Sequence, residues 1–487
     1  MRQLTIERSA VIILFALLFA LATRVPIDSD TWWHIRSGEH ILNEEFIRQD
    51  PFSFTKFGED WVNHSWGSQI VIFAVWEIAG NFGLAIYTAL LATAGMAVLF
   101  RISAGSVYLR MFVLVIGAAT AAIFWSPRPQ MMSFFLSTIV LYILYLYKRR
   151  GIDRLWLLPI VMMLWGNLHA GFSIGFILMG GVIAGEIINN LLNRDEDDVI
   201  PISGIRKLIV ISLISAVALV INPYGPKILL VPFQTASLTT LQNFIQEWNS
   251  PNFHERQTWP FIILTVALIL AVGNSRKRLD WTDFILVSGT FFMALLAGRN
   301  IAVYAVAATP VVAYYLDATL KDRGWVLRTV KRPTRRMTRI NAVLVSVIVL
   351  ASLAKVLVVL DTETVTAAQE QFLPVHVAEY LNEHQPPGPI FNSYNWGGYL
   401  MFAAPSYPVF VDGRTDLYGD EFLTTYLQTA RAGDNWRETL DEFGINSIVV
   451  EVNSGLGRAI REEPGWRLDY EDEMAVVFVR ERGMDDN

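Results

Sequence analysis

The chain has 487 residues, of which 53% are hydrophobic and only 17% are charged, and its mean hydropathy is +0.38. This is not the composition of a water-soluble globular protein, so we expect most of the chain to lie in lipid. The formal net charge is −6, and the basic residues gather between apolar runs, which indicates membrane orientation rather than nucleic-acid binding. The absence of cysteine excludes disulfides, thiolate metal sites and cysteine nucleophiles.

Eleven apolar segments predict about eleven membrane-spanning helices. The first segment follows Arg2 and Arg8 and also has the pattern of a cleavable signal peptide, but the informative polar segment directly after it favours a retained helix. The segments are 10–22, 84–100, 111–125, 131–147, 155–170, 172–192, 208–221, 259–272, 284–297, 301–316 and 342–360.

The basic residues predict how these helices are oriented. They concentrate at 101–110, 148–154, 206–207, 276–278 and 321–339, which the positive-inside rule places in the cytoplasm. With a cytoplasmic amino terminus, this assignment works only if the apolar stretch 67–79 does not cross the bilayer, so we expect an interfacial or re-entrant helix there. Eleven is odd, so the chain after Leu360 is expected outside the cytoplasm.

Two domains follow from this pattern. Residues 1–360 are expected to form a transmembrane domain, with a long first outer loop at 25–83 that contains a helix at 31–42. Residues 361–487 have no further apolar run and are expected to form a small extracytoplasmic α/β domain. Its helix-like piece is 375–383, and its strand-like pieces are 408–411, 446–450 and 474–479.

Under this topology the unusual polar and aromatic residues fall near the outer membrane edge. Solvation or interfacial anchoring accounts for any one of them alone, so only their convergence indicates a site. The candidates are Asp28, Asp30, Trp32, Trp33, His34, Asn63, His64, Trp66, Arg128, Asn167, His169, Tyr224, Glu247 and Arg299.

The first outer loop resembles that of the GT-C superfamily of membrane glycosyltransferases, and is most similar to the protein-mannosyltransferase-like and rhizobial lipopolysaccharide-glycosyltransferase-like bacterial members. The resemblance lies in Asp-Ser-Asp-Thr-Trp-Trp-His at 28–34, Asp-Pro-Phe-Ser-Phe-Thr at 50–55 and Trp-Val-Asn-His-Ser-Trp at 61–66. It implies a bacterial cytoplasmic-membrane enzyme that transfers a sugar, with inversion, from a polyprenyl-phosphate donor. The acceptor, a saccharide, lipid or protein, would be used at the extracytoplasmic face.

Within this resemblance the candidate residues take roles that suit their chemistry. A carboxylate, Asp28 or Asp30, would act as general base toward the acceptor. Arg128 and Arg299 would stabilise the lipid phosphate, because a guanidinium matches phosphate oxygens. Further donor contacts are expected from His64 and His169, and substrate contacts from Trp32, Trp33, His34, Asn63, Trp66, Asn167, Tyr224 and Glu247.

Each role has a structural alternative. Asp28 and Asp30 also suit the amino cap of the 31–42 helix, whose free backbone N–H groups an Asp satisfies. The arginines also suit anchoring at the headgroups, and the tryptophans an aromatic belt.

A metal is left unassigned. Asp28, Asp30 and His34 have the donor atoms for Mg²⁺ or Mn²⁺, and the oligosaccharyltransferase branch of the superfamily uses such an ion. The protein-mannosyltransferase-like branch generally does not.

The carboxyl-terminal domain contains two polar segments of open role. Residues 391–399, Phe-Asn-Ser-Tyr-Asn-Trp-Gly-Gly-Tyr, precede Val-Asp-Gly-Arg-Thr-Asp at 411–416. Aromatic and amide groups beside glycine suit sugar binding or a cover over the membrane site, whereas turn formation is the simpler interpretation.

Two other classes of protein compete with an enzyme. A transporter or flippase of a lipid-linked saccharide is disfavoured, because most spans lack deep charges and no inverted repeat is visible. A membrane receptor with an outer ligand-binding domain leaves the long first loop unexplained.

Overall fold

The structure is a computed structural model that describes residues 4–192, 198–325 and 333–481. The chain divides into two compact units, and neither is continuous in sequence. Unit 1 consists of Met1–Arg24, Ala85–Leu229 and Ile245–Val359. Unit 2 consists of Val25–Leu84, Leu230–Phe244 and Leu360–Asn487, so the first loop belongs to the same compact unit as the carboxyl-terminal part of the chain.

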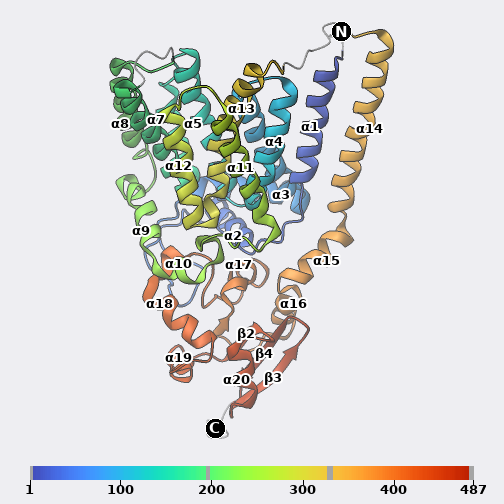
Figure 1. Cartoon of the computed structure of the whole chain (residues 1–487). Coiled ribbons are helices and arrows are strands. Elements are labelled where there is room, and N and C mark those ends of the chain that lie inside the picture. Colours follow the sequence, from blue (N-terminus) through green and yellow to red (C-terminus); the bar gives the residue numbers. More distant parts are fainter. Residues whose placement is uncertain (1–3, 193–197, 326–332, 482–487) are drawn as a thin grey trace. The chain divides into compact units, whose positions relative to one another are not determined.

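Unit 1 is a helical bundle whose long helices run side by side (Figure 1). All eleven predicted apolar segments coincide with helices. These are α1 (Ile6–Ala22), the second part of α3 (Trp66–Ile102), α4 (Val107–Ala121), α5 (Gln130–Arg150), α6 (Leu157–Leu168), α7 (Ser173–Leu192), α8 (Ile202–Ala218), α11 (Trp259–Asn274), α12 (Trp281–Leu296), α13 (Ile301–Asp322) and α14 (Arg335–Val359).

Seven helices of the described residues are long and apolar enough to cross a membrane, and α6 and α12 are shorter apolar helices. Helix α13 is almost wholly buried and packs against α4, α11 and α12, whereas α14 packs mainly on α1 and leaves most of its apolar side chains exposed. Exposed apolar helix surface of this kind is stable in lipid. The protein is therefore a multi-pass helical membrane protein, as its composition predicts.

Helix α3 contains the segment 67–79, and a backbone break at Gly80 separates it from the following turns. Gly80 has φ 52° and ψ −139°, a conformation that glycine adopts without the steric cost of a Cβ. The segment is thus helical, as expected. Its interfacial or re-entrant placement stays a prediction.

A buried ionic network joins α5, α7 and α12 near one end of unit 1. Lys148 forms ion pairs with Glu186 and, at 2.8 Å, with Asp280. Glu186 is fully buried and also accepts hydrogen bonds from the Thr282 hydroxyl at 2.6 Å and the Ile200 backbone N–H at 2.7 Å. The carboxylate is therefore solvated by donors from three separate parts of the bundle.

We expect Glu186→Ala to lower the thermal unfolding midpoint of the protein in detergent, because it removes the carboxylate from a buried ion pair. Loss of one partner of such a pair costs about 3–5 kcal/mol. Lys207→Ala is the matched control. Lys207 pairs with Asp153 in a half-exposed ion pair, and such pairs contribute about 0–1 kcal/mol. Equal midpoints for the two variants would contradict the interpretation.

Unit 2 contains a four-stranded mixed sheet and short helices. The strands are β1 (Ile390–Asn392), β2 (Ser447–Glu451), β3 (Trp466–Glu471) and β4 (Ala475–Arg480), in the order β1-β2-β4-β3. Strands β1 and β2 are parallel, and the other pairs are antiparallel. The helices are α15 (Thr362–Phe372), α16 (Val375–His384), α17 (Tyr394–Ala403), α18 (Thr415–Ala430), α19 (Trp436–Glu442) and α20 (Gly455–Ala459).

The α/β class of this part is confirmed, and so are the helix at 375–383 and the strands at 446–450 and 474–479. The expected strand at 408–411 is not part of the sheet. Val409 instead forms an isolated parallel bridge with Ser53 of the first loop. Here the Phe54 N–H donates to the Val409 carbonyl at 3.2 Å, and the Thr55 hydroxyl donates to the Phe410 carbonyl at 2.6 Å.

The first loop contributes α2 (Asp30–Asn43), which confirms the helix expected at 31–42. Helix α2 packs against α17 through aromatic contacts. Trp32 is 2% exposed, and its ring centroid lies 5.2 Å from that of Tyr399 and 5.1 Å from that of Phe402. These contacts make the start of α2 part of the core of unit 2.

The segment Leu230–Phe244 forms α9 (Val231–Ser237) and α10 (Thr239–Phe244), and α18 holds the start of α10. Asp420 accepts hydrogen bonds from the backbone N–H groups of Thr240 at 2.8 Å and Thr239 at 2.9 Å. These bonds stabilise the carboxylate and lower the pKa of Asp420 to about 2.

We expect α10 to loosen from α18 as the pH falls from about 4 toward 2. A carboxyl group with a lowered pKa stabilises the folded state above its ordinary pKa and loses this effect as it becomes protonated. The change is measured as the hydrogen-exchange protection factor of residues 230–244, the ratio of the intrinsic to the observed exchange rate, between pH 5 and pH 2. Asp420→Asn should show weaker protection than the wild-type protein at pH 5 and a smaller difference from it at pH 2. A protection factor that is unaffected by both pH and the substitution would show that Asp420 does not hold this segment.

Candidate functional site

Two arginines and a glutamate that the sequence separates widely converge at one end of unit 1. The Glu247 carboxylate lies 3.6 Å from the Arg128 guanidinium and 3.5 Å from that of Arg299. The Arg299 guanidinium also stacks 4.3 Å above the ring of Trp248, a distance typical of a cation–π contact. We call Arg128, Glu247, Trp248 and Arg299 the arginine cluster.

Short connections between helices position these side chains. Arg128 lies between two prolines directly before α5, and its backbone N–H donates to the Ser126 carbonyl at 2.7 Å. Glu247 belongs to the 3-10 turn Gln246–Trp248, and Arg299 to the 3-10 turn Gly298–Asn300. The Gly298 N–H donates to the Asn249 carbonyl at 2.9 Å, so the two turns are hydrogen-bonded to each other.

The arginine cluster brings two permanently charged guanidinium groups to one carboxylate. Partial burial of Glu247 raises the pKa of its carboxyl, but Arg128 and Arg299 outweigh this effect, and the resulting pKa lies below its usual range. Glu247 is therefore ionised at neutral pH. Two neighbouring guanidinium groups have the donor geometry that suits an anion such as a phosphate group.

His169, Asn167 and Tyr224 lie at the same end of unit 1. His169 ends α6, and its Nδ1 accepts a hydrogen bond from the Gly171 N–H at 3.1 Å and lies 2.7 Å from the Ser133 hydroxyl, on the second turn of α5. With Nδ1 as acceptor, the neutral ring carries its proton on Nε2.

The Asn167 amide donates to the Ile221 carbonyl at 2.8 Å, and its oxygen accepts from Asn222 at 3.2 Å. Tyr224 is buried, and its backbone N–H donates to the Asn222 side-chain oxygen at 3.0 Å. These contacts join the ends of α6 and α8, so the polar groups of Asn167 and Asn222 hold helix ends together.

Two further cations lie at this end of unit 1, and the sequence interpretation missed both. Arg24 donates to the Ala122 carbonyl at 2.9 Å, at the end of α4. Lys355 of α14 donates to the carbonyls of Ala20 at 2.5 Å and Thr23 at 2.6 Å, the last carbonyls of α1. A lone lysine inside the apolar run 342–360 was the available signal, because such a charge needs a partner.

In unit 2 the two candidate carboxylates lie at the start of α2. The Asp28 carboxylate accepts a hydrogen bond from the Asp30 N–H at 3.0 Å, so it satisfies a free donor at the helix start, as the capping alternative predicts. Asp30 is the first helical residue, and its carboxylate accepts a bond from the Trp33 indole at 3.3 Å. Both side chains are partly exposed.

The other candidates from the first loop are mainly packing residues. Trp33 is buried, and its ring lies 3.5 Å from that of His34. The side-chain amides of Gln69 and Asn63 form two hydrogen bonds with each other, at 2.6 Å and 2.8 Å. The Gln69 amide nitrogen also lies 3.4 Å from His34 Nδ1. His64 and Trp66 are partly buried. His64 contacts the Ser65 hydroxyl at 2.9 Å, and the ring of Trp66 lies against that of Phe46.

A buried ion cluster in unit 2, which the sequence interpretation did not foresee, consists of Asp50, Asp412 and Arg414. All three side chains are fully buried. The Arg414 guanidinium donates to Asp50, and to both carboxylate oxygens of Asp412 at 2.8 Å and 2.6 Å. The rings of Phe52 and Trp61 lie 5.3 Å and 5.0 Å from the guanidinium carbon.

The residues of the candidate site do not form a metal centre. Among the residues that the structure describes, no group of three or more His, Asp or Glu side chains is placed to hold an ion. The Asp28 and Asp30 carboxylates instead bond to a backbone N–H and an indole N–H.

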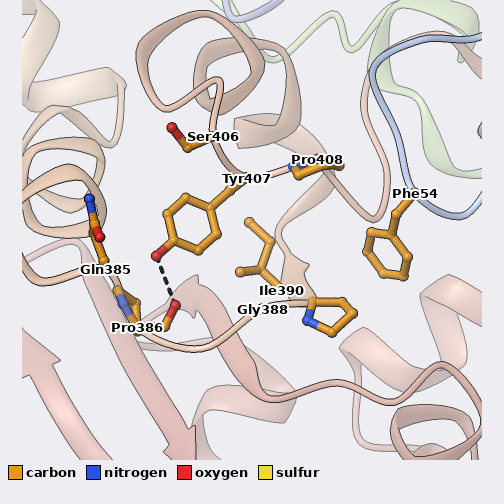
Figure 2. A pocket seen from close by; sticks show the side chains of 9 residues that line it. Phe54, Gln385, Pro386, Gly388, Ile390, Ser406, Tyr407 and Pro408 are labelled. Carbon is orange, nitrogen blue, oxygen red and sulfur yellow. Dashed lines mark hydrogen bonds between the residues drawn. The ribbon is translucent and has the colours of Figure 1, made fainter.

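Unit 2 also contains a cavity of about 510 Å³ beside the bridge between the first loop and residue 409 (Figure 2). Figure 2 shows the Tyr407 ring at its centre, with the hydroxyl donating to the Pro386 carbonyl at 2.8 Å. The rest of the wall is largely apolar, with Gln385 and Ser406 as its polar side chains. Its lining carries no charge, which distinguishes it from the arginine cluster.

Comparison with known proteins places the fold. No family model and no curated protein matches the chain. The structure is similar to the oligosaccharyltransferase of Archaeoglobus fulgidus, with a TM-score of 0.58, 11% identity, and coverage of 91% of this chain and 69% of the other.

It is also similar to ArnT from Cupriavidus metallidurans bound to undecaprenyl phosphate, with a TM-score of 0.51, 14% identity, and coverage of 96% and 97% of the two chains. The arabinofuranosyltransferase AftD from Mycobacteria gives a TM-score of 0.52 at 14% identity, over 99% of this chain but only 40% of AftD. The chain therefore has the fold of the GT-C membrane glycosyltransferases, as the resemblance predicted.

Proposed function

We propose that the protein is a membrane glycosyltransferase that transfers a sugar from a polyprenyl-phosphate donor to an acceptor at the extracytoplasmic face of a bacterial cytoplasmic membrane. The observation that carries this proposal is the arginine cluster, in which two guanidinium groups converge on Glu247, in a chain with the GT-C fold. A shared fold does not by itself define an activity, so the chemistry of the site has to support it.

The arginine cluster is the proposed site of the donor phosphate. Guanidinium groups remain charged at any pH of interest and bind phosphate oxygens through paired N–H donors. They also stabilise the negative charge that develops on the phosphate as the bond to the sugar breaks. ArnT, which has the same fold, was solved with undecaprenyl phosphate bound, and this supports a lipid phosphate as the ligand.

Asp30 is the proposed general base, and Asp28 is the second candidate. The acceptor oxygen attacks the anomeric carbon and loses its proton to the carboxylate, while the bond between that carbon and the phosphate oxygen breaks. The products are the glycosylated acceptor and polyprenyl phosphate. A single displacement from the face opposite the leaving group inverts the configuration. Asp30 is favoured because the Asp28 carboxylate already holds the start of α2.

We expect Asp30→Asn to lower sugar transfer from radiolabelled polyprenyl-phosphate sugars by about 10²- to 10⁴-fold, the usual contribution of general base catalysis. The assay uses the full-length protein in nanodiscs and a panel of donors and acceptors, with Asp28→Asn measured in parallel. Asp60→Asn, an exposed carboxylate of the same loop, is the matched control and should retain activity. Transport of the intact donor without transfer would indicate a flippase instead.

We expect Arg128→Gln and Arg299→Gln each to weaken binding of undecaprenyl phosphate by about 10- to 100-fold, because a hydrogen bond to a charged group contributes about 1.5–3 kcal/mol. Glu247→Gln should have the opposite effect, since it raises the net charge of the arginine cluster. Arg101→Gln, at the far end of α3, is the control. Equal affinities in all four variants would show that the lipid phosphate binds elsewhere.

A further inference from the structure

The Asp30 carboxylate lies directly against a glycine of the carboxyl-terminal part of unit 2. A Cβ atom added at Gly413 would lie 2.1 Å from Asp30 Oδ1 and 3.2 Å from Trp33 Nε1. These are the two atoms that form the hydrogen bond described above, at 3.3 Å. The backbone of Gly413 therefore closes one side of the carboxylate, and any larger residue there displaces it.

A second glycine makes a similar contact one residue before the helix. A Cβ at Gly398 in α17 would lie 2.7 Å from the Ser29 carbonyl oxygen and 3.0 Å from the Trp33 ring. Neither glycine has a positive φ, so the contact distance rather than backbone conformation requires the small residue. The start of α2 is thus enclosed by two backbone segments.

The buried ion cluster fixes the backbone on both sides of Gly413. Asp412 and Arg414 are its immediate neighbours, and Asp412 also accepts a hydrogen bond from the Tyr418 hydroxyl at 2.8 Å. Arg414 connects this segment to Asp50, 364 residues away in sequence. The Gly413 carbonyl itself accepts from the Thr415 N–H at 3.0 Å, so the turn has little freedom to move.

The ion cluster and the two glycine contacts favour a functional role over simple packing. Replacing a buried ion cluster with apolar side chains is often neutral or stabilising, so stability alone does not require this arrangement. The arrangement does define one geometry for the backbone beside Asp30. A general base has to be held close to its productive position, because a shift of about 1 Å can lower a rate about 10²-fold.

We propose that the segment 412–414 is a positioning element that holds the Asp30 carboxylate in its reactive orientation. The proposal rests on the proposed function, in which Asp30 is the general base. Gly413 contacts the carboxylate, and Asp412 and Arg414 anchor Gly413 to the first loop through Asp50. Residues 411–416 then act as part of the reaction machinery and not as an ordinary turn.

The test compares Gly413→Ala with Gly388→Ala in the full-length protein in nanodiscs. No atom lies within 4 Å of a Cβ added at Gly388, so this variant controls for a glycine replacement in the same unit. We expect Gly413→Ala to lower kcat about 10- to 100-fold while KM for the polyprenyl-phosphate sugar is unchanged. Gly388→Ala should match the wild-type protein in both constants. Gly398→Ala should show a smaller loss of kcat of the same kind.

A double-variant cycle separates positioning from a structural effect. Because Gly413 acts through Asp30, adding Gly413→Ala to Asp30→Asn should cause no further loss of transfer. A loss of the same size in both backgrounds, or an unchanged kcat in Gly413→Ala, overturns the positioning role and leaves the proposed function intact. A lack of transfer by the wild-type protein with every donor overturns the proposed function, and the positioning role with it.

Discussion

Arg414 has no exposed side-chain surface, so its charge is stable only because Asp50 and Asp412 lie against it and supply acceptors for its donors. The organisation of unit 2 depends on this interaction. Asp50 comes from the first loop and Arg414 from the segment after α17, so the ion cluster cannot form until two distant parts of the chain have met. The bridge between Ser53 and Val409 and the aromatic packing of α2 on α17 then complete the same interface.

Unit 1 has a group of charged side chains near each end of α5. Lys148, at the end of α5, is enclosed with Glu186 and Asp280 in a network that satisfies every carboxylate involved. Arg128, just before the start of the same helix, faces one glutamate that a second arginine shares. Loss of one member of the closed network leaves an uncompensated buried charge, whereas the arginine cluster is the proposed site of the donor phosphate. Helix α5 therefore connects a buried ionic network with the proposed phosphate site.

The sequence was sufficient for the helices of unit 1, because an apolar run of the right length has few alternatives in lipid. It also placed Arg128, Glu247 and Arg299 on one side of the membrane, though nothing in their spacing indicated that they converge on one carboxylate. Strand β1 was missed because three residues give no periodicity, and β3 because Trp466–Glu471 is largely polar. Residues 408–411 have a strand-like composition but pair with the first loop, and tertiary contacts of this kind override local propensity.

The ion pair between Asp50 and Arg414 lay outside the reach of sequence reasoning for the same reason. Asp50 was noted only within the segment 50–55 of the resemblance and Arg414 only within the segment 411–416, and only the fold brings the two residues together. The glycines at 398 and 413 were noted as turn formers. The structure shows that a Cβ atom at either position would lie too close to the start of α2. Local composition predicts what a segment can form by itself, whereas it does not predict which other segment it will contact.

Lys355 has a consequence for how the protein is made. Its ammonium group supplies the partner for the last carbonyls of α1, which lie 335 and 332 residues earlier in the chain. During synthesis, α1 enters the membrane long before α14 has left the ribosome, and the carbonyls at its end depend on water or headgroups in the interval. The docking of α14 on α1 is therefore a late event in biogenesis, and it joins the first helix of unit 1 to the last.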